Sequence, residues 1–260
     1  MIPLFSKPKV VSEKGSVAVF EIEALYPGYG VTIGNSLRRV LFSSLPGAAV
    51  SKMKIKGVPH EFTTIPGVYE DVLQIMLNLK KLRFKMFSDE PQKAILSLKG
   101  EREVKGKDFQ IPSQMELVNK DEYIATLTDK KAELEMEIEV EKGIGYLPRE
   151  KRKREKLGIG EILIDAIFTP VKRVGYQVEN MRVGDRTDFD KIIMEVETDG
   201  TISPQEAMAQ ASQILVDHFS LINQTFLTPE KPKVAREKKE KQKAKKAKKA
   251  VKSKKKKSKK

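Results

Sequence analysis

A long amphipathic segment between residues 203 and 226 constrains the fold of this chain more than any other feature of its sequence. It begins with Ser203, Pro204 and Glu206, which supply an N-cap, a proline at the first helical position and a glutamate that completes a capping box. Apolar side chains then recur at three- and four-residue spacing: Met208, Ala211, Ile214 or Leu215, Phe219, Ile222 and Phe226. A helix of about six turns with one continuous apolar stripe is predicted to pack against another helix.

The rest of the chain alternates between strand and helix patterns. Residues 16–24 place apolar and acidic side chains on opposite faces with the two-residue period of a strand. Thr32 is the predicted N-cap of a helix that ends near residue 45, and its apolar stripe contains Ile33, Leu37, Val40 and Leu41. A second helical stripe runs from Val68 to Leu79. Strands are predicted within 83–142, at 173–179 and at 191–198, so the fold class is α+β.

The charge of the chain is concentrated at one end. The 260 residues carry a net charge of +14, from 50 Lys and Arg against 36 Asp and Glu. Residues 229–260 hold 18 of the basic and 3 of the acidic residues, which leaves 32 basic and 33 acidic residues in the first 228. We therefore expect a nearly neutral folded body and a disordered, Lys-rich tail that is attracted to phosphates.

The residues needed for most enzymatic chemistry are missing. The sequence has no Cys, which excludes disulfides, thiolate metal sites and a cysteine nucleophile. His60 and His218 are its two histidines, and we interpret both as structural. No phosphate-binding loop motif occurs. The longest apolar run has four residues, far below the roughly 20 that span a bilayer, and the first residues lack a secretory signal, so a cytoplasmic location is predicted.

Two acidic clusters could suggest a metal site. Asp185, Asp188 and Asp190 form the best candidate, but Arg186 lies among them and ordinary turn chemistry explains them better. Five glutamates alternate with apolar residues over 133–141, and we interpret them as the solvated face of a strand because such a row does not converge on one ion. The sequence therefore favours a binding or assembly protein over a self-sufficient enzyme.

The residues alone do not decide the roles of two basic features. Arg38 and Arg39 flank the apolar stripe of the 32–45 helix, where they are either a solvated pair or a contact for carboxylates or phosphates of a partner. The segment 149–156 holds six basic and two acidic residues. It is predicted to be a solvated loop, with nucleic-acid contact as the alternative.

A set of short motifs occurs in a fixed order along the chain. The first and longest runs from Gly30 to Leu41, followed by Ser43-Ser44 and Pro46-Gly47. The others, in chain order, are His60-Glu61-Phe62, Glu70-Asp71-Val72-Leu73, Leu77-Asn78-Leu79-Lys80, Gly143-Ile144-Gly145-Tyr146, Arg186-Thr187-Asp188 and Glu197-Thr198-Asp199-Gly200-Thr201-Ile202. In this order the motifs resemble those of the alpha subunits of bacterial and plastid RNA polymerases, and the agreement covers nearly all of residues 1–228.

The resemblance implies a two-part fold and a homodimer. Residues 1–46 and 175–228 would form a discontinuous dimerisation subdomain, 47–174 a strand-rich inserted subdomain, and 229–260 a tail. The two stripe-bearing helices would pack against their symmetry mates in a two-fold dimer. The implied interface residues are Ile33, Leu37, Leu41, Ala211, Leu215, Phe219 and Ile222.

The resemblance also implies a function. The dimer would nucleate assembly of a DNA-directed RNA polymerase, one copy contacting mainly the beta subunit and the other mainly beta prime. By motif match, Arg39 with Arg38 beside it would lie at the beta contact, and Lys80 at the interface with the large subunits. Catalysis would belong to magnesium ions held on beta prime, so no cofactor and no catalytic residue are expected in this chain, which would act in the cytoplasm at the nucleoid.

One departure from the family pattern keeps alternatives open. Most bacterial members continue into a small helical domain that binds promoter DNA, and residues after Thr228 do not match it, so those contacts are not transferred to this chain. A nucleic-acid packaging or ribosome-associated dimer that acts through its Lys tail is one alternative. An enzyme that binds a metal at Asp185, Asp188 or Asp190 is another.

Overall fold

The computed structural model describes residues 5–152, 158 and 160–227. The chain divides into two compact units, Met1–Leu215 and Val216–Lys260, and helix α3 crosses their boundary. The Lys-rich tail and residues 153–156 of the basic segment lie outside the described residues. Among the described residues, no helix is long and apolar enough to cross a membrane. The structure mixes helices with antiparallel sheets, which confirms the α+β prediction.

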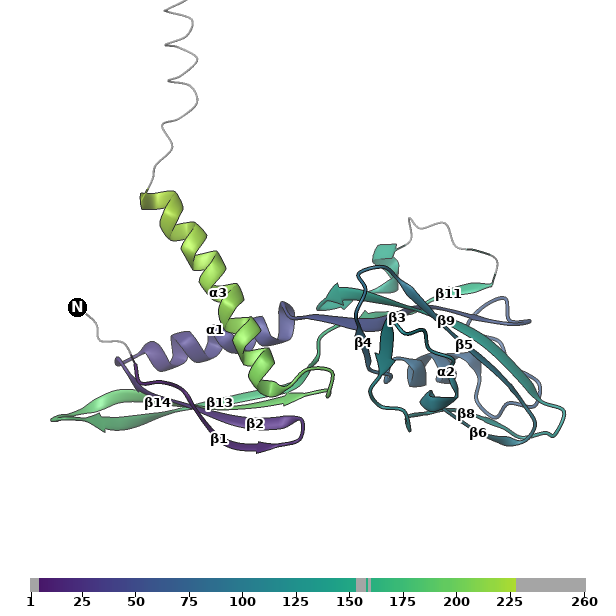
Figure 1. The fold of residues 1–260 in the computed structure, drawn as a ribbon, viewed down its shortest axis with the longest axis horizontal. Coiled ribbons are helices and arrows are strands. Elements are labelled where there is room, and N and C mark those ends of the chain that lie inside the picture. The colour runs from purple at the N-terminus through teal and green to yellow at the C-terminus, as the bar shows by residue number, and fades with distance from the viewer. Residues whose placement is uncertain (1–4, 153–157, 159, 228–260) are drawn as a thin grey trace, which may run out of the picture. The chain divides into compact units, whose positions relative to one another are not determined.

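The first sheet joins the two ends of the folded sequence. It has four antiparallel strands in the order β1 (Lys9–Lys14), β2 (Val17–Leu25), β14 (Arg186–Thr198) and β13 (Val171–Val183). Helix α1 (Tyr29–Ser43) lies along one face of this sheet, and the first turns of α3 (Pro204–Leu227) contribute to the same core (Figure 1). That core contains Phe20, Ile22, Leu41, Met194 and Ala211. The alternation predicted at 16–24 is confirmed from Ala18 to Ile22, where every second side chain is buried. It breaks at Ala24, which has a positive φ (62°) and is half-buried, so that Leu25 is the next buried side chain.

The second sheet is built from the middle of the chain. Its order is β5 (Gln92–Lys99), β9 (Glu133–Ile144), β3 (Pro46–Ile55), β4 (Phe84–Met86) and β7 (Met115–Leu117), and β11 (Glu161–Leu163) pairs with β3. Two small sheets pair β6 (Arg102–Lys105) with β8 (Tyr123–Leu127), and β10 (Tyr146–Leu147) with β12 (Ala166–Ile167). Helix α2 (Val72–Leu79) and the short helices η1 (Gly106–Asp108) and η2 (Arg149–Arg152) complete this region. A separate core with Ile75, Leu79, Phe84, Leu96 and Ile138 fills it.

Helix ends account for the main differences from the predicted elements. The predicted N-cap at Thr32 is wrong, because α1 begins at Tyr29 after Gly28 in a left-handed conformation (φ 84°). The second helix begins at Val72, since the Asp71 carboxylate accepts a hydrogen bond from Gln74 N at 2.7 Å, whereas Val68 pairs with strand β8. The capping box of α3 is confirmed: Ser203 and Glu206 exchange side-chain to backbone hydrogen bonds of 3.0 and 3.2 Å.

The glutamate row of β9 is a sheet face and not an ion site. Four of its carboxylates form ion pairs of 2.6–3.1 Å with lysines of strand β3, strand β5 and the residue after β3. The pairs are Lys99 with Glu133, Lys56 with Glu135, Lys93 with Glu137 and Lys52 with Glu139. Opposite charges on neighbouring strands stabilise the sheet, so this acidic face is neutralised by its neighbours.

Candidate functional site

The arginine pair is presented by a helix that packs unusually close to its sheet. Gly30 and Gly34 face strand β13, four residues apart on one side of α1. A Cβ at Gly34 would lie 2.8 Å from the ring of Tyr176, well inside contact distance, and one at Gly30 would meet a similar obstacle. Arg38 and Arg39 lie one turn further along the helix, and both are exposed. The glycines therefore place the backbone, and the two guanidinium groups remain available to a partner.

Of the predicted carboxylate cluster, Asp190 on strand β14 holds the start of this helix. One carboxylate oxygen of Asp190 accepts hydrogen bonds from the N–H groups of Gly28 and Gly30, both at 2.9 Å, and the side chain is buried. Asp188 instead pairs with Arg186 through two hydrogen bonds of 2.7 and 3.0 Å, which lower the pKa of its carboxyl. The described residues contain no group of side chains that could hold a metal ion. The metal interpretation of Asp185, Asp188 and Asp190 is therefore not supported, and Asp190 serves as a helix cap.

Lys80, at the end of α2, is engaged within the chain. Its ammonium group forms an ion pair of 2.8 Å with Asp165, and the two side chains are 20% and 27% exposed. The other oxygen of Asp165 accepts a hydrogen bond from Arg149 N at 2.9 Å. These donors, Lys80 first, lower the pKa of the Asp165 carboxyl below its ordinary value. Sequence reasoning identified Lys80 by resemblance but missed Asp165, which lies 85 residues away.

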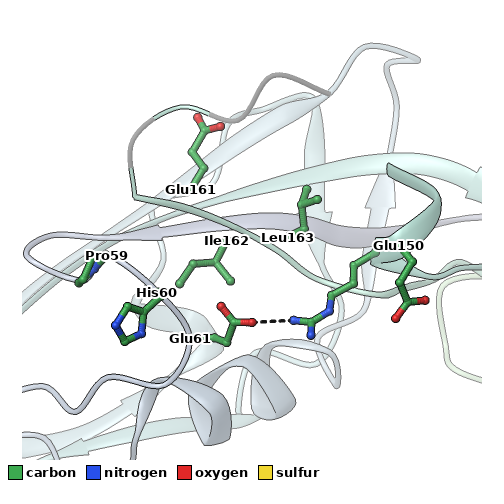
Figure 2. Close-up of a pocket in the computed structure, with 8 residues that line it drawn as sticks. Pro59, His60, Glu61, Glu150, Glu161, Ile162 and Leu163 are labelled. Carbon is green, nitrogen blue, oxygen red and sulfur yellow. Dashed lines mark hydrogen bonds and ion pairs between the residues drawn. The ribbon is translucent and has the colours of Figure 1, made fainter. Parts of the chain in front are cut away.

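Arg149 extends the same chain of contacts to the His60-Glu61-Phe62 motif. Its guanidinium donates to a Glu61 carboxylate oxygen at 2.9 Å. A backbone hydrogen bond and the Arg149 guanidinium lower the pKa of Glu61. Both residues line a pocket of about 310 Å³, and the dashed line at Glu61 in Figure 2 marks their ion pair. The other lining residues are Pro59, His60, Glu150, Glu161, Ile162 and Leu163.

The start of the basic segment is structured and not a solvated loop. Residues 149–152 form η2, and Arg152 is only 5% exposed. Its guanidinium makes two hydrogen bonds, of 2.8 and 3.3 Å, to the carboxylate of Glu141 on β9. The prediction of a solvated loop is therefore wrong for Arg149 and Arg152, whose charges are satisfied by glutamates that lie outside the segment.

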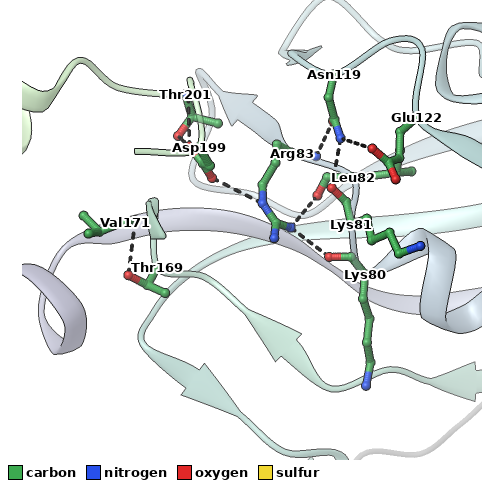
Figure 3. Close-up of polar contacts among 10 residues, drawn as sticks. All are labelled: Lys80, Lys81, Leu82, Arg83, Asn119, Glu122, Thr169, Val171, Asp199 and Thr201. Carbon is green, nitrogen blue, oxygen red and sulfur yellow. Dashed lines mark hydrogen bonds and ion pairs between the residues drawn. The ribbon is translucent and has the colours of Figure 1, made fainter. Parts of the chain in front are cut away.

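Arg83, four residues after the end of α2, was not identified from the sequence either. Arg83 donates to the carbonyl oxygens of Lys80 and Leu82 at 2.7 and 3.1 Å, so it satisfies carbonyl groups at the C-terminus of the helix. The same guanidinium lies 3.5 Å from a carboxylate oxygen of Asp199, whose other oxygen accepts two hydrogen bonds from Thr201 (Figure 3). A cation just after a helix was the available signal.

The apolar residues predicted for a dimer interface fall into three groups, which are buried, half-buried and exposed. Leu37, Leu41 and Ala211 are buried in the core of their own chain, where they contact the first sheet or its helices. Ile33 and Leu215 are half-buried at the edge of that core. Phe219 and Ile222 are 61% and 53% exposed. The stripe of α3 therefore changes character along the helix, from a buried first half to an exposed second half.

The two histidines occupy exposed positions. The Nδ1 atom of His60 lies 3.1 Å from the hydroxyl of Thr63. His218 lies on the exposed second half of α3. Neither belongs to a group of potential metal ligands within the described residues.

Comparison with known proteins gives consistent matches. A family model described as the RNA polymerase Rpb3/RpoA insert domain matches residues 53–169. A protein of Roseiflexus sp. strain RS-1, named DNA-directed RNA polymerase subunit alpha, is 50% identical over 216 residues, or 83% of this chain and 66% of the relative. A protein of the same name from Symbiobacterium thermophilum is 47% identical over 236 residues, or 89% of this chain and 75% of the relative.

The extent of these matches differs between relatives. A third protein with the same name, from Herpetosiphon aurantiacus, is 52% identical over 203 residues, or 78% of this chain and 61% of the relative. The chain thus spans slightly less than two thirds of the length of the Roseiflexus and Herpetosiphon relatives and three quarters of the Symbiobacterium relative.

Proposed function

The chain belongs to the family of DNA-directed RNA polymerase alpha subunits, and we propose that it is a non-catalytic scaffold subunit of that polymerase. In this proposal two copies form a homodimer, and the dimer binds the beta and beta prime subunits in the cytoplasm. RNA synthesis, a nucleotidyl transfer that depends on magnesium, belongs to the assembled enzyme and to another subunit. None of the comparisons supports the packaging or ribosome-associated alternative.

The exposed second half of α3 is the observation that carries the proposal. Phe219, Ile222 and Phe226 continue the stripe whose first half is buried, and Phe226 is 80% exposed. Fully burying one such side chain contributes about 1.5–3 kcal/mol, so the stripe as a whole could drive association. A second copy would supply an identical stripe, as a two-fold interface requires. Because Leu37, Leu41 and Ala211 are already covered, the proposed interface consists of Ile33, Leu215, Phe219 and Ile222.

The presence of two cores supports a division into two subdomains. One core joins α1, the first turns of α3 and the first sheet, and the other lies within the middle of the chain. We assign residues 1–46 and 175–228 to dimerisation and 47–174 to the inserted subdomain, although Val171 and Val174 at the start of β13 already contribute to the first core. Arg38 and Arg39 are proposed contacts for beta, since exposed guanidinium groups suit carboxylates on a partner. Lys80 is proposed to act at the interface with the large subunits.

The oligomeric state of designed variants tests the proposal. Phe219→Glu combined with Ile222→Glu places two charges in the stripe, and we expect a monomer by sedimentation at concentrations where the wild-type chain is a dimer. Leu221→Glu is the matched control, because Leu221 is 64% exposed but lies on a different side of the helix. Co-purification with the beta and beta prime subunits is measured in parallel and should fall in the double variant only. A wild-type chain that is monomeric and captures neither large subunit would refute the scaffold function.

A further inference from the structure

Lys80 has little freedom to serve as a direct contact for another protein. Its ammonium lies 2.8 Å from an Asp165 carboxylate oxygen, and four fifths of its side chain is buried. Reaching a partner would require breaking this partly buried ion pair and leaving the Asp165 carboxylate without its cation, which is costly. The neighbouring Lys81, by contrast, is exposed and donates a hydrogen bond to its helix neighbour Asn78.

The ion pair belongs to a continuous series of contacts. Asp165 accepts hydrogen bonds from Lys80 and from the backbone of Arg149, and Arg149 in turn pairs with Glu61 at 2.9 Å. The series therefore links the end of α2, the residues after β11, helix η2 and the loop after β3. The end of α2 and the loop after β3 carry residues of the family motifs. The loop after β3 and η2 also line the pocket of Figure 2.

We propose that Lys80 is a positioning residue, which acts through Asp165 and Arg149 to hold the Glu61 loop and the wall of the 310 Å³ pocket in place for a large subunit. The inference rests on the proposed function and refines it. The surface that meets the large subunit is formed by the Glu61 loop and η2. The charge of Lys80 is neutralised within the chain by Asp165.

Asp165→Asn separates positioning from direct contact. The substitution keeps the size of the side chain and an oxygen that can accept from Arg149 N, but it removes the charge that holds Lys80. If Lys80 were a contact, this change would free its ammonium and leave binding unchanged or stronger. If Lys80 is a positioning residue, Asp165→Asn and Lys80→Met should weaken binding to the same extent, and the double variant should be no worse than either single variant.

The kinetics of binding to the purified large subunits provide the second readout. An exposed contact charge changes the association rate constant and its dependence on ionic strength, whereas loss of an internal pair acts through dissociation. We expect the dissociation rate constant to rise about tenfold in Lys80→Met and Asp165→Asn. The association rate constant and its salt dependence should stay at the wild-type values. Lys80→Arg, which can keep the ion pair, should restore binding, and Lys81→Met is the control for loss of one exposed charge.

Each outcome has a separate meaning. Equal, non-additive losses through dissociation support the positioning role. Unchanged or tighter binding of Asp165→Asn, or a reduced salt dependence of association in Lys80→Met alone, overturns it while leaving the scaffold function intact. A wild-type chain that binds no large subunit overturns the scaffold function and this inference together. Since Asn is nearly isosteric with Asp, Asp165→Asn decides the question even if Lys80→Met does not fold.

Discussion

Asp190 shows how one side chain sets the position of a functional helix. Its carboxylate accepts hydrogen bonds from the N–H groups of Gly28 and Gly30 at the start of α1, about 160 residues earlier in the sequence. We predict that Asp190→Ala lowers the free energy of unfolding by about 1–2 kcal/mol, because two buried donors lose their acceptor. Urea denaturation measures the change. Asp188→Ala removes an exposed carboxylate from the same strand and should cost less than about 0.5 kcal/mol, and equal losses in the two variants would contradict the capping role.

The ion pair of Asp165 should make the free energy of unfolding depend on pH. Its pKa is lowered in the folded chain, first by Lys80 and then by the Arg149 N–H. A carboxyl of this kind stabilises the fold above its unfolded pKa of about 3.9, and the contribution is lost as the pH falls through the folded value. The stability difference between wild type and Asp165→Asn should therefore be constant between about pH 5 and 7 and shrink below about pH 4.

Urea unfolding at a series of pH values checks this expectation. Asp185→Asn, in the exposed turn between β13 and β14, should change stability little at any pH. A difference between wild type and Asp165→Asn that persists undiminished at the lowest pH would show that the ion pair with Lys80 is not its source.

At the scale of elements, the close packing of α1 against β13 leads to a prediction. A methyl group at Gly34 would lie 2.8 Å from the Tyr176 ring, so Gly34→Ala must displace either the helix or the ring. We expect a loss of about 1–3 kcal/mol in the free energy of unfolding, the usual cost of overpacking. Gly175→Ala on β13 is the control, because a Cβ there meets nothing within 4 Å and should cost little. A neutral Gly34→Ala would show that α1 does not depend on this close approach.

Local patterns predicted the elements well, and distant contacts were what they missed. The capping box at Ser203 and the alternation in β2 are local signals, and both are confirmed. The start of α1 was misplaced at Thr32 because its cap comes from Asp190, far away in the sequence. The basic segment was misread for a related reason, since Glu141 and Glu61 neutralise its arginines only after folding. Periodicity reports which face is apolar, but not which charge from another element lies opposite.

In the candidate site, too, local features could be predicted from the sequence and contacts between distant segments could not. Arg38 and Arg39 could be placed on an exposed flank from helical spacing alone, and the structure confirms their exposure. The family resemblance selected Lys80, but its ion pair with Asp165 depends on how α2 packs beside the residues after β11 and could not be read from either segment. The apolar stripe of α3 was visible in sequence, whereas its division into a buried and an exposed half required the first sheet.

At the scale of the whole molecule, charge separates the body from the residues that follow it. The first 228 residues are nearly neutral, while residues 229–260 carry a net charge of +15. If the chain is a scaffold subunit as proposed, this Lys-rich tail gives the assembled polymerase a sequence-independent attraction to DNA phosphates. Its removal after Thr228 should weaken DNA binding at low salt and reduce the slope of log affinity against log salt, by about 0.9 for each phosphate that the segment neutralises.

The location of the DNA affinity then distinguishes a polymerase subunit from a packaging protein. In the proposed function, the truncated chain still dimerises and binds both large subunits, and only the salt-dependent DNA affinity of the assembled enzyme changes. A packaging protein would instead show the same DNA affinity in the isolated full-length dimer, with or without the large subunits. Binding of DNA measured between about 50 and 200 mM salt, for the free dimer and the assembled polymerase, separates the two. An affinity and slope that truncation leaves unchanged would mean that the attraction to DNA comes from elsewhere in the enzyme.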